Sequence, residues 1–225
     1  MTVRSDGART RERLLAAALA VFAKKGYFDT KVADVCRRAR ANRAAVSYHF
    51  GGKQHLYAEV WRHAFAEADR LVPIDGGLPG DAPAEARLRA LVFAILSRIL
   101  RHGTRSQSGR LLLMEMARPL PALDAVRREA TRPVRRTIRA ITRELLGPDA
   151  DGDRVNRTAM CIMHQMLAIG FRGGRKPPLL GEGPFSDAEV DALVDHVVLF
   201  SLGGIASVAR AAASRPAIRR KGAAG

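Results

Sequence analysis

Apolar residues in the first 70 positions recur at the spacing of amphipathic helices, with polar residues between them. The pattern predicts helices over residues 8–25, 31–39, 43–50 and 53–68. In the second of these, Val32, Val35 and Ala39 fall at i, i+3 and i+7, which places them on one buried stripe. No segment shows sustained alternation of apolar and polar residues, so we expect an all-α protein.

Two of the predicted helices, 31–39 and 43–50, are separated by three residues, which predicts a helix-turn-helix over about 31–50. Asn42 is a strong candidate for the N-cap of the second helix. Val46 and Phe50 form an i, i+4 apolar pair that we expect to face inward. The other positions of this helix are left for the outside or the flanks: Arg43, Ala44, Ala45, Ser47, Tyr48 and His49.

A proline- and glycine-rich stretch, PIDGGLPGDAP at residues 73–83, interrupts the helical pattern and indicates a linker. It separates a predicted DNA-binding domain over 8–68 from a C-terminal domain over 83–213. Beyond the linker, helical spacing predicts helices near 84–102, 108–118, 122–146, 153–171 and 186–213. Pro133 lies inside one of them and either kinks or splits it. We expect residues 214–225 to form a disordered tail.

The formal net charge of the 225-residue chain is +16, from 38 Lys and Arg against 22 Asp and Glu. Such an excess favours a polyanionic partner, most simply nucleic acid, although a generally arginine-rich composition gives the same total. Residues 1–70 carry +7 and residues 71–225 carry +9. Positive charge is therefore denser in the predicted DNA-binding domain without being confined to it.

The two cysteines, Cys36 and Cys161, match no metal or redox spacing, and we expect both to be buried thiols in a reducing cytoplasm. The first residues are polar and contain no apolar signal region. No apolar run approaches the roughly 20 residues needed to span a bilayer. We therefore expect a cytoplasmic protein without a membrane partner.

Three segments, LLAAALAVFAKKGYFDT, VADVCRRA and VSYHFGGKQHLY, lie within roughly residues 9–61 and resemble the TetR/AcrR family of bacterial transcriptional regulators. A later segment, LLLMEMARPLPALDAVRREATRP, resembles a subgroup labelled by a CerR-type C-terminal domain. The resemblance implies a three-helix DNA-binding domain, and a fourth helix that ties it to a larger helical domain. That larger domain dimerises in the family and often binds a small effector. The chain departs from the family at Arg40, where glycine is usual, because positive φ costs a residue with a Cβ about 1 kcal/mol.

The resemblance and the residue chemistry together predict the DNA contacts. Arg43 can pair with a guanine edge or a phosphate, and the methyl groups of Ala44 and Ala45 can contact thymine methyls. Tyr48 and His49 match family positions that approach the DNA backbone and bases. The predicted DNA-binding residues are Thr30, Arg43, Ala44, Ala45, Ser47, Tyr48, His49 and Lys53.

Two residues in this set lie at predicted helix starts. Lys53 begins a helix, where free backbone N–H groups and the positive end of the helix dipole favour a phosphate. The preceding Gly51 and Gly52 let the DNA backbone approach closely. Thr30 can cap the helix over 31–39, bind a phosphate, or do both.

Methionine adapts to irregular pockets, so several apolar residues of the C-terminal domain are candidate effector contacts, although ordinary core packing explains the same spacing. The predicted effector-pocket residues are Phe93, Leu96, Met114, Met160, Met163, His164 and Phe171. The helices over 153–171 and 186–213 carry more apolar surface than one core needs. This surplus predicts a two-fold four-helix interface between two copies of the chain.

An arginine-rich run extends from Arg127 to Arg143. Its spacing spreads charge around much of the predicted helix over 122–146, so we favour a solvated surface. The alternatives are contact with an anionic effector or with flanking DNA.

These features predict a homodimeric, sequence-specific transcriptional regulator, most simply a repressor that a small-molecule effector releases from its double-stranded DNA operator. The alternative is an architectural DNA-binding protein without strong sequence preference. An enzyme is disfavoured because the sequence has no histidine pair at i, i+4, no paired-carboxylate cluster and no glycine-rich phosphate loop after a strand. We expect neither a cofactor nor a metal site.

Overall fold

The computed structural model describes the backbone of residues 3–102, 105–170 and 175–213, and its regular secondary structure is helical, which confirms the all-α prediction. The α-helices are α1 (Val3–Lys25), α2 (Val32–Ala39), α3 (Arg43–Phe50), α4 (Lys53–Leu71), α5 (Ala84–Leu96), α6 (Gln107–Ala117), α7 (Asp124–Ala130), α8 (Arg132–Leu146), α9 (Gly152–Gly170) and α10 (Asp187–Ala213). A π-helix, η1 (Ser97–His102), and two 3-10 turns, η2 (Pro121–Leu123) and η3 (Pro178–Leu180), lie between them. The predicted tail over 214–225 and Phe171 lie outside the described residues.

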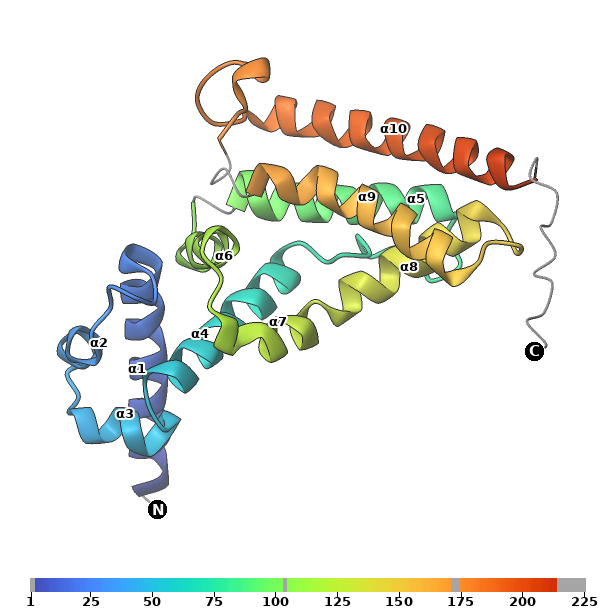
Figure 1. The fold of residues 1–225 in the computed structure, drawn as a ribbon. Helices are drawn as coiled ribbons and strands as arrows, with labels where there is room; N and C mark the ends of the chain where they lie inside the picture. The colour runs from blue at the N-terminus through green and yellow to red at the C-terminus, as the bar shows by residue number, and fades with distance from the viewer. Residues whose placement is uncertain (1–2, 103–104, 171–174, 214–225) are drawn as a thin grey trace, which may run out of the picture.

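Helices α1 to α4 form a small bundle around an apolar core, at the lower left of Figure 1. Leu14, Ala18 and Phe22 are fully buried at i, i+4 and i+8 along α1, so one continuous apolar stripe of this helix faces the inside of the bundle. Val46 and Phe50 of α3 are buried in the same cluster, which confirms that they face inward. The opposite face of α3 is therefore turned to solvent.

The N-terminal bundle shares its core with helices that lie beyond the linker. Leu111 of α6, Leu123 of η2 and Val126 of α7 belong to the same buried cluster as α1 to α4. Helix α6 packs on both α1 and α4, and α7 packs on α4. Because packed interiors transmit displacements, a shift of α6 or α7 also acts on the helices that carry the helix-turn-helix.

A second core lies among α5, η1, α8, α9 and α10, in the right half of Figure 1. Leu88 and Leu91 of α5 are fully buried at i, i+3, and Ile138 and Ile141 supply the buried side of α8 at the same spacing. Helix α5 packs on α8 and α10, and α9 packs on α8. These helices make the larger, C-terminal part of the fold.

Two predicted helices differ from the structure in how they end or divide. The helix predicted over 84–102 changes character at Ser97, where the π-helix η1 begins, and the buried hydroxyl of Ser97 has no hydrogen-bond partner among the described residues. The helix predicted over 122–146 is split into α7 and α8. Pro133 lies in the first turn of α8, where its missing N–H removes no helical hydrogen bond, so the proline splits the segment rather than kinking it.

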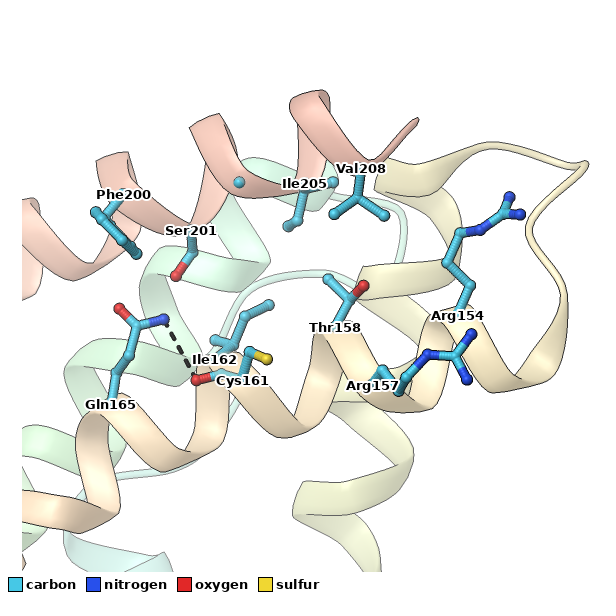
Figure 2. Close-up of a pocket in the computed structure, with 11 residues that line it drawn as sticks. Arg154, Arg157, Thr158, Cys161, Ile162, Gln165, Phe200, Ser201, Ile205 and Val208 are labelled. Carbon is cyan, nitrogen blue, oxygen red and sulfur yellow. Dashed lines mark hydrogen bonds between the residues drawn. The ribbon is translucent and has the colours of Figure 1, made fainter. Parts of the chain in front are cut away.

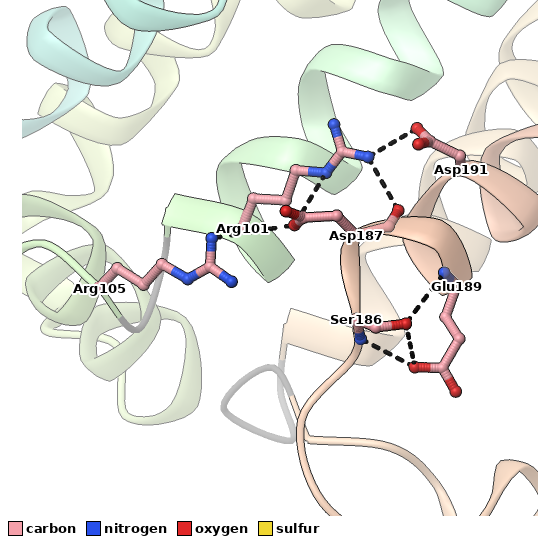
Figure 3. Close-up of polar contacts among 6 residues, drawn as sticks. All are labelled: Arg101, Arg105, Ser186, Asp187, Glu189 and Asp191. Carbon is pink, nitrogen blue, oxygen red and sulfur yellow. Dashed lines mark hydrogen bonds and ion pairs between the residues drawn. The ribbon is translucent and has the colours of Figure 1, made fainter.

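The start of α10 is capped by reciprocal hydrogen bonds, drawn in Figure 3. Ser186 donates its backbone N–H and its hydroxyl to the same carboxylate oxygen of Glu189, both at 2.8 Å. The N–H of Glu189 donates back to the Ser186 hydroxyl at 3.3 Å, which completes a capping box. Lys176 Nζ lies 2.6 Å from the other carboxylate oxygen of Glu189. The Lys176 contact first, and then the two Ser186 donors, lower the pKa of Glu189 to about 2.

Arginines of η1 and the segment after it hold the same end of α10 from the opposite side (Figure 3). A guanidinium nitrogen of Arg101 donates to the backbone carbonyl of Asp187 at 2.9 Å and to the carboxylate of Asp191 at 2.6 Å. Arg105 lies 3.8 Å from the Asp187 carboxylate. The first turns of α10 are thereby fixed to the π-helix.

Helix α10 corrects the expectation that no apolar run is long enough to cross a membrane. Residues Asp187–Ala211 form a 25-residue helical stretch that is sufficiently long and apolar. One such helix is weak evidence of a membrane span, because the core helices of soluble proteins pass the same test. Here Asp191 and Asp195 of this stretch are paired with Arg101 and Arg89, which fixes the helix against η1 and α5.

Candidate nucleic-acid interface

The turn between α2 and α3 depends on one residue in the left-handed region. Arg40 has φ 49° and ψ 50°, and among the described residues it is the one non-glycine with positive φ. The N–H of Ala41 donates to the Cys36 carbonyl at 3.0 Å and closes the end of α2. Arginine therefore adopts the conformation in which the family has glycine, at a cost of about 1 kcal/mol.

Helix α3 begins at a side-chain cap and is anchored by two apolar residues. The Asn42 side chain accepts a hydrogen bond from the N–H of Ala45 at 2.8 Å, which confirms the predicted N-cap. Val46 and Phe50 hold the helix on the bundle. Cap and anchors together fix both the start and the rotation of α3, so its outward residues have defined directions.

The outward face of α3 presents most of the predicted DNA-binding residues together. Tyr48 is 85% exposed, and Arg43, Ala44 and Ser47 are also exposed. Ala45 and His49 lie at the flanks and are half-buried. The helix thus projects small side chains in its first turn and a tyrosine near its end, a shape that fits a major groove.

Lys53 lies directly after α3 at the start of α4. Gly51 and Gly52 between the two helices have φ 72° and 135°, so the chain reverses in conformations that favour glycine. The first hydrogen bond into α4 runs from the N–H of Leu56 to the Gly52 carbonyl at 3.0 Å, which leaves the preceding N–H groups at the helix end for a ligand. Lys53 Nζ lies 4.3 Å from the centre of the Tyr27 ring. Burial lowers the pKa of Lys53, and Asp29 partly opposes this shift.

Thr30 does not cap α2. Its side chain is buried, and its hydroxyl donates to the Gly26 carbonyl at 2.7 Å. The N-cap of α2 is Lys31, whose N–H approaches the Asp34 carboxylate at 3.5 Å. The prediction of a Thr30 cap is therefore wrong, because the hydroxyl is used to close the end of α1. The predicted contact between Thr30 and a phosphate stays a prediction, although the hydroxyl proton is already used in this hydrogen bond.

Asp34 is in turn held by Lys25, whose Nζ lies 2.8 Å from its carboxylate. The Lys25 hydrogen bond is the largest cause of a lowered pKa at Asp34. This contact fixes the end of α1 against the start of α2.

Two arginines of α1 contact the helix-turn-helix, one at α3 and one at the turn before it, and sequence reasoning missed both contacts. The Arg11 guanidinium lies 5.2 Å from the Phe50 ring centre and pairs with Glu59 of α4 at 2.9 Å. Arg13 donates to the carbonyl of Arg40 at 3.4 Å. The sequence shows these residues only as basic positions of an amphipathic helix, which gives no signal of where they reach.

A buried carboxylate connects the helix-turn-helix bundle with α6 and α7. Glu115 of α6 is 3% exposed, and it accepts hydrogen bonds from the Tyr57 hydroxyl at 2.9 Å and the Leu120 N–H at 2.8 Å. Arg127 of α7 pairs with the same carboxylate. Burial, followed by the charge of Glu115, raises the pKa of Tyr57. We refer to Glu115, Tyr57 and Arg127 as the interdomain node.

The predicted effector-pocket residues that the structure describes differ in burial. Leu96 is fully buried in the C-terminal core, and Met163 is half-buried. The remaining described candidates are exposed: Phe93, Met114, Met160 and His164. Their spacing along helices gave no information about which faces the neighbouring helices cover.

A cavity of about 330 Å³ lies between α9 and α10, whose lining side chains point toward one another (Figure 2). Its middle is lined by Cys161 and Ile162 of α9 and by Ser201 and Ile205 of α10. Cys161 is exposed, which corrects the prediction that both cysteines are buried; Cys36 is buried as expected. The buried hydroxyl of Ser201 lacks a hydrogen-bond partner among the described residues.

An N-capped, exposed helix on a three-helix bundle, joined by α4 to a larger helical part, defines a helix-turn-helix DNA-binding protein. Comparison with known proteins identifies the family. The model for bacterial regulatory proteins of the tetR family matches residues 14–60. The model for the C-terminal domain of the HTH-type transcriptional dual regulator CecR matches residues 84–205, more than half of the chain. The chain belongs to the TetR family of transcriptional regulators, and the subgroup given above as CerR-type is matched under the name CecR.

Two curated relatives illustrate the similarity. The transcriptional dual regulator CecR of Shigella flexneri is 25% identical over 213 residues, which cover 88% of this chain and 91% of CecR. The transcriptional repressor NicS of Pseudomonas putida is 32% identical over 97 residues, which cover 42% of this chain and 43% of NicS. The match to NicS thus spans less than half of that relative. Regulators of this kind are generally not enzymes.

Solved structures share the fold at lower identity. A putative transcriptional regulator from Pseudomonas aeruginosa PAO1 has a TM-score of 0.66 at 21% identity, over 89% of this chain and 92% of that one. FadR from Bacillus subtilis, in complex with stearoyl-CoA, has a TM-score of 0.64 at 14% identity, over 86% of this chain and 98% of FadR. AibR, in complex with isovaleryl coenzyme A and operator DNA, has a TM-score of 0.60 at 16% identity, over 82% of this chain and 96% of AibR.

Proposed function

We propose that the chain is a cytoplasmic, homodimeric repressor that binds an operator through α3 of each copy and releases it when a small effector occupies the C-terminal part. The observation that carries this proposal is the rigid exposure of α3. Asn42, Val46 and Phe50 fix the helix, while Ser47 and Tyr48 face solvent. A helix held in this way can read base edges without first being ordered.

The residues around α3 divide into base-reading and phosphate-binding roles. Arg43, at the exposed start of the helix, is placed for a guanine edge, with Ala44 beside it for a thymine methyl. Tyr48 and Lys53 flank the far end, where the free N–H groups of α4 add donors for a phosphate. Phosphate contacts set register and affinity, and base contacts set specificity.

The outer face of α9 and α10 supports dimerisation. Leu199 and Phe200 are 73% and 64% exposed, and Met160 and Val208 are also exposed. Phe200 and Val208 also line the cavity of Figure 2, and apolar surface of this kind is costly to leave in water. A second copy related by a two-fold axis would cover it with its own α9 and α10 and would present two α3 helices to one duplex.

Effector release is supported by the packing between the two parts of the chain. Helix α6 contacts both α1 and α4, and the interdomain node joins α4 to α6 and α7. An effector that binds more tightly to a different arrangement of these helices would shift the dimer away from the operator-binding spacing. Because FadR and AibR hold acyl-coenzyme A molecules, acyl-CoAs are the first effectors to test.

Selection of bound fragments from genomic DNA, followed by competition with unrelated DNA, tests the proposal. A repressor retains a small set of fragments when unrelated duplex is added in excess. An architectural protein is displaced equally by every duplex, and that result would contradict the proposal. Tyr48→Ala and Lys53→Ala should each weaken binding to all fragments, and Lys53→Ala should also lessen the salt dependence because it removes a cation. Arg43→Ala should instead relax preference at one base step.

A further inference from the structure

The arginine-rich run is arranged differently from its sequence prediction. The break between α7 and α8 separates Arg127 and Arg128 from the rest of the run. On α8, the arginines recur at helical spacing within one exposed stripe: Arg132, Arg135, Arg136, Arg139 and Arg143. The expectation that charge is spread around the helix is therefore wrong, because the opposite side of α8 is apolar and packs on the core. We refer to these five residues as the α8 arginine stripe.

The stripe is not neutralised within the protein. None of its five arginines forms an ion pair with another described residue. The single acidic residue of α8 is Glu144, which pairs with Arg87 of α5 instead. Arg135 donates to the carbonyl of Arg128 at 2.5 Å and Arg143 reaches the Ala150 carbonyl at 3.5 Å, so their charges stay uncompensated. Arginines left adjacent and unpaired repel one another, and an external polyanion relieves that repulsion.

The direction of the stripe follows from the packing of α8. Helix α8 contacts α5, α9 and α10, so its exposed face points away from them. Figure 1 shows α8 along the lower edge of the C-terminal part, with α10 on the far side and α3 below and to the left. The face of α8 that carries the stripe is therefore turned away from α5, α9 and α10, and α3 lies at the same lower side of Figure 1. The stripe extends from Arg132 to Arg143, about 16 Å at the rise of an α-helix.

We propose that the α8 arginine stripe is a second, sequence-independent DNA surface that attracts the phosphates of the duplex held by α3. This inference rests on the proposed function, because it assumes that α3 holds DNA. In a dimer paired through α9 and α10, two stripes would flank the duplex between the half-sites. Their contribution is the release of counterions, which raises affinity for operator and unrelated DNA alike.

Salt-dependent binding separates this role from base reading. The variant Arg132→Gln/Arg136→Gln/Arg139→Gln/Arg143→Gln is titrated with a selected operator and with an unrelated duplex over a range of salt concentrations. We expect both affinities to fall by about tenfold or more, and the ratio between them to stay within about twofold. The salt slope should drop by about 0.9 for each phosphate that the variant no longer neutralises. The matching Arg→Lys variant should retain most of the slope, since it retains the charge.

A matched pair controls for net charge. Arg136→Gln/Arg139→Gln and Arg70→Gln/Arg175→Gln remove the same charge from exposed positions on and off the stripe. The first pair should lower the salt slope more than the second. Equal slopes for the two pairs would overturn the proposal, as would an unchanged slope in the fourfold variant. Loss of binding to vesicles containing anionic lipid, with DNA binding unchanged, would assign the stripe to a membrane and overturn it too. If the stripe variants give any of these contradicting results but the protein still binds its operator selectively, only the role of the stripe is refuted and the proposed function stands. Failure of the stripe proposal can thus be distinguished from failure of the proposed function.

Discussion

Breaking the interdomain node should lower the free energy of unfolding, because the Glu115 carboxylate at its centre is buried. Replacing Arg127 with Gln leaves the Glu115 carboxylate with two hydrogen-bond donors but no cation. Glu115 is 3% exposed and Arg127 is 24% exposed, so the substitution leaves a buried carboxyl group without its ion-pair partner. Removing one partner of a buried pair costs about 3–5 kcal/mol, and the partial exposure of Arg127 places this case near 3 kcal/mol.

Glu115→Gln removes the charge but leaves an acceptor for the Leu120 N–H, so its cost should be about 1.5 kcal/mol. The double variant should be more stable than the sum of the single losses predicts, with a coupling energy of about 1–2 kcal/mol. Urea unfolding at a fixed protomer concentration measures these differences. The single tryptophan, Trp61, is buried in α4 and reports on the shared core directly.

Arg128→Gln is the matched control, since Arg128 is the exposed neighbour of Arg127 on α7 and forms no ion pair with a described residue. Its unfolding free energy should stay within about 0.5 kcal/mol of the unsubstituted protein. If Arg127→Gln were no less stable than Arg128→Gln, the carboxylate would be solvated, and the node could not connect the two parts of the chain.

Three further predictions concern the turn, the start of α10 and the dimer. Arg40→Gly should raise the unfolding free energy by up to about 1 kcal/mol, because it relieves the left-handed strain, and urea unfolding that shows a loss would contradict this. Because the pKa of Glu189 is lowered in the folded state, its carboxylate contributes stability above pH 4.5, and this contribution is lost as the pH falls toward 2. Glu189→Gln should therefore flatten that part of an acid unfolding curve, and an unchanged curve would refute this prediction. Leu199→Glu/Phe200→Glu should convert dimers to monomers in sedimentation, whereas persistent dimers would place the interface elsewhere.

The positions of the helices in the N-terminal part could be predicted closely from the sequence. The apolar stripe of α2, the Asn42 cap and the inward pair Val46 and Phe50 are local features, and local spacing determines them. For Arg40 the sequence allows either a turn with a strained arginine or a turn built differently. Hydrogen bonding at the end of α2 decides between them, and the sequence does not show it. The N-cap at Thr30 was predicted wrongly because its hydroxyl bonds backward to Gly26.

The C-terminal features depend on contacts between distant segments, which spacing does not reveal. Glu115 interrupts the apolar run LLLMEM, and this was a usable signal of a buried charge, but its partners Tyr57 and Arg127 come from different helices. The arginines from Arg132 to Arg143 recur at helical spacing in the sequence itself, so their single stripe could have been predicted, whereas the break between α7 and α8 was not. Exposure of Cys161 likewise depends on how α10 lies over α9.

The most direct test of the central claim places a DNA-cleaving reagent on α3. Ser47→Cys in a Cys161→Ser background provides one exposed thiol on the outward face, since Cys36 is buried. Bound to a selected fragment, the reagent should cut in two clusters separated by about one helical turn or a multiple of it. Cuts scattered evenly along the fragment, or no cuts while the protein remains bound, would contradict the account that α3 reads the operator.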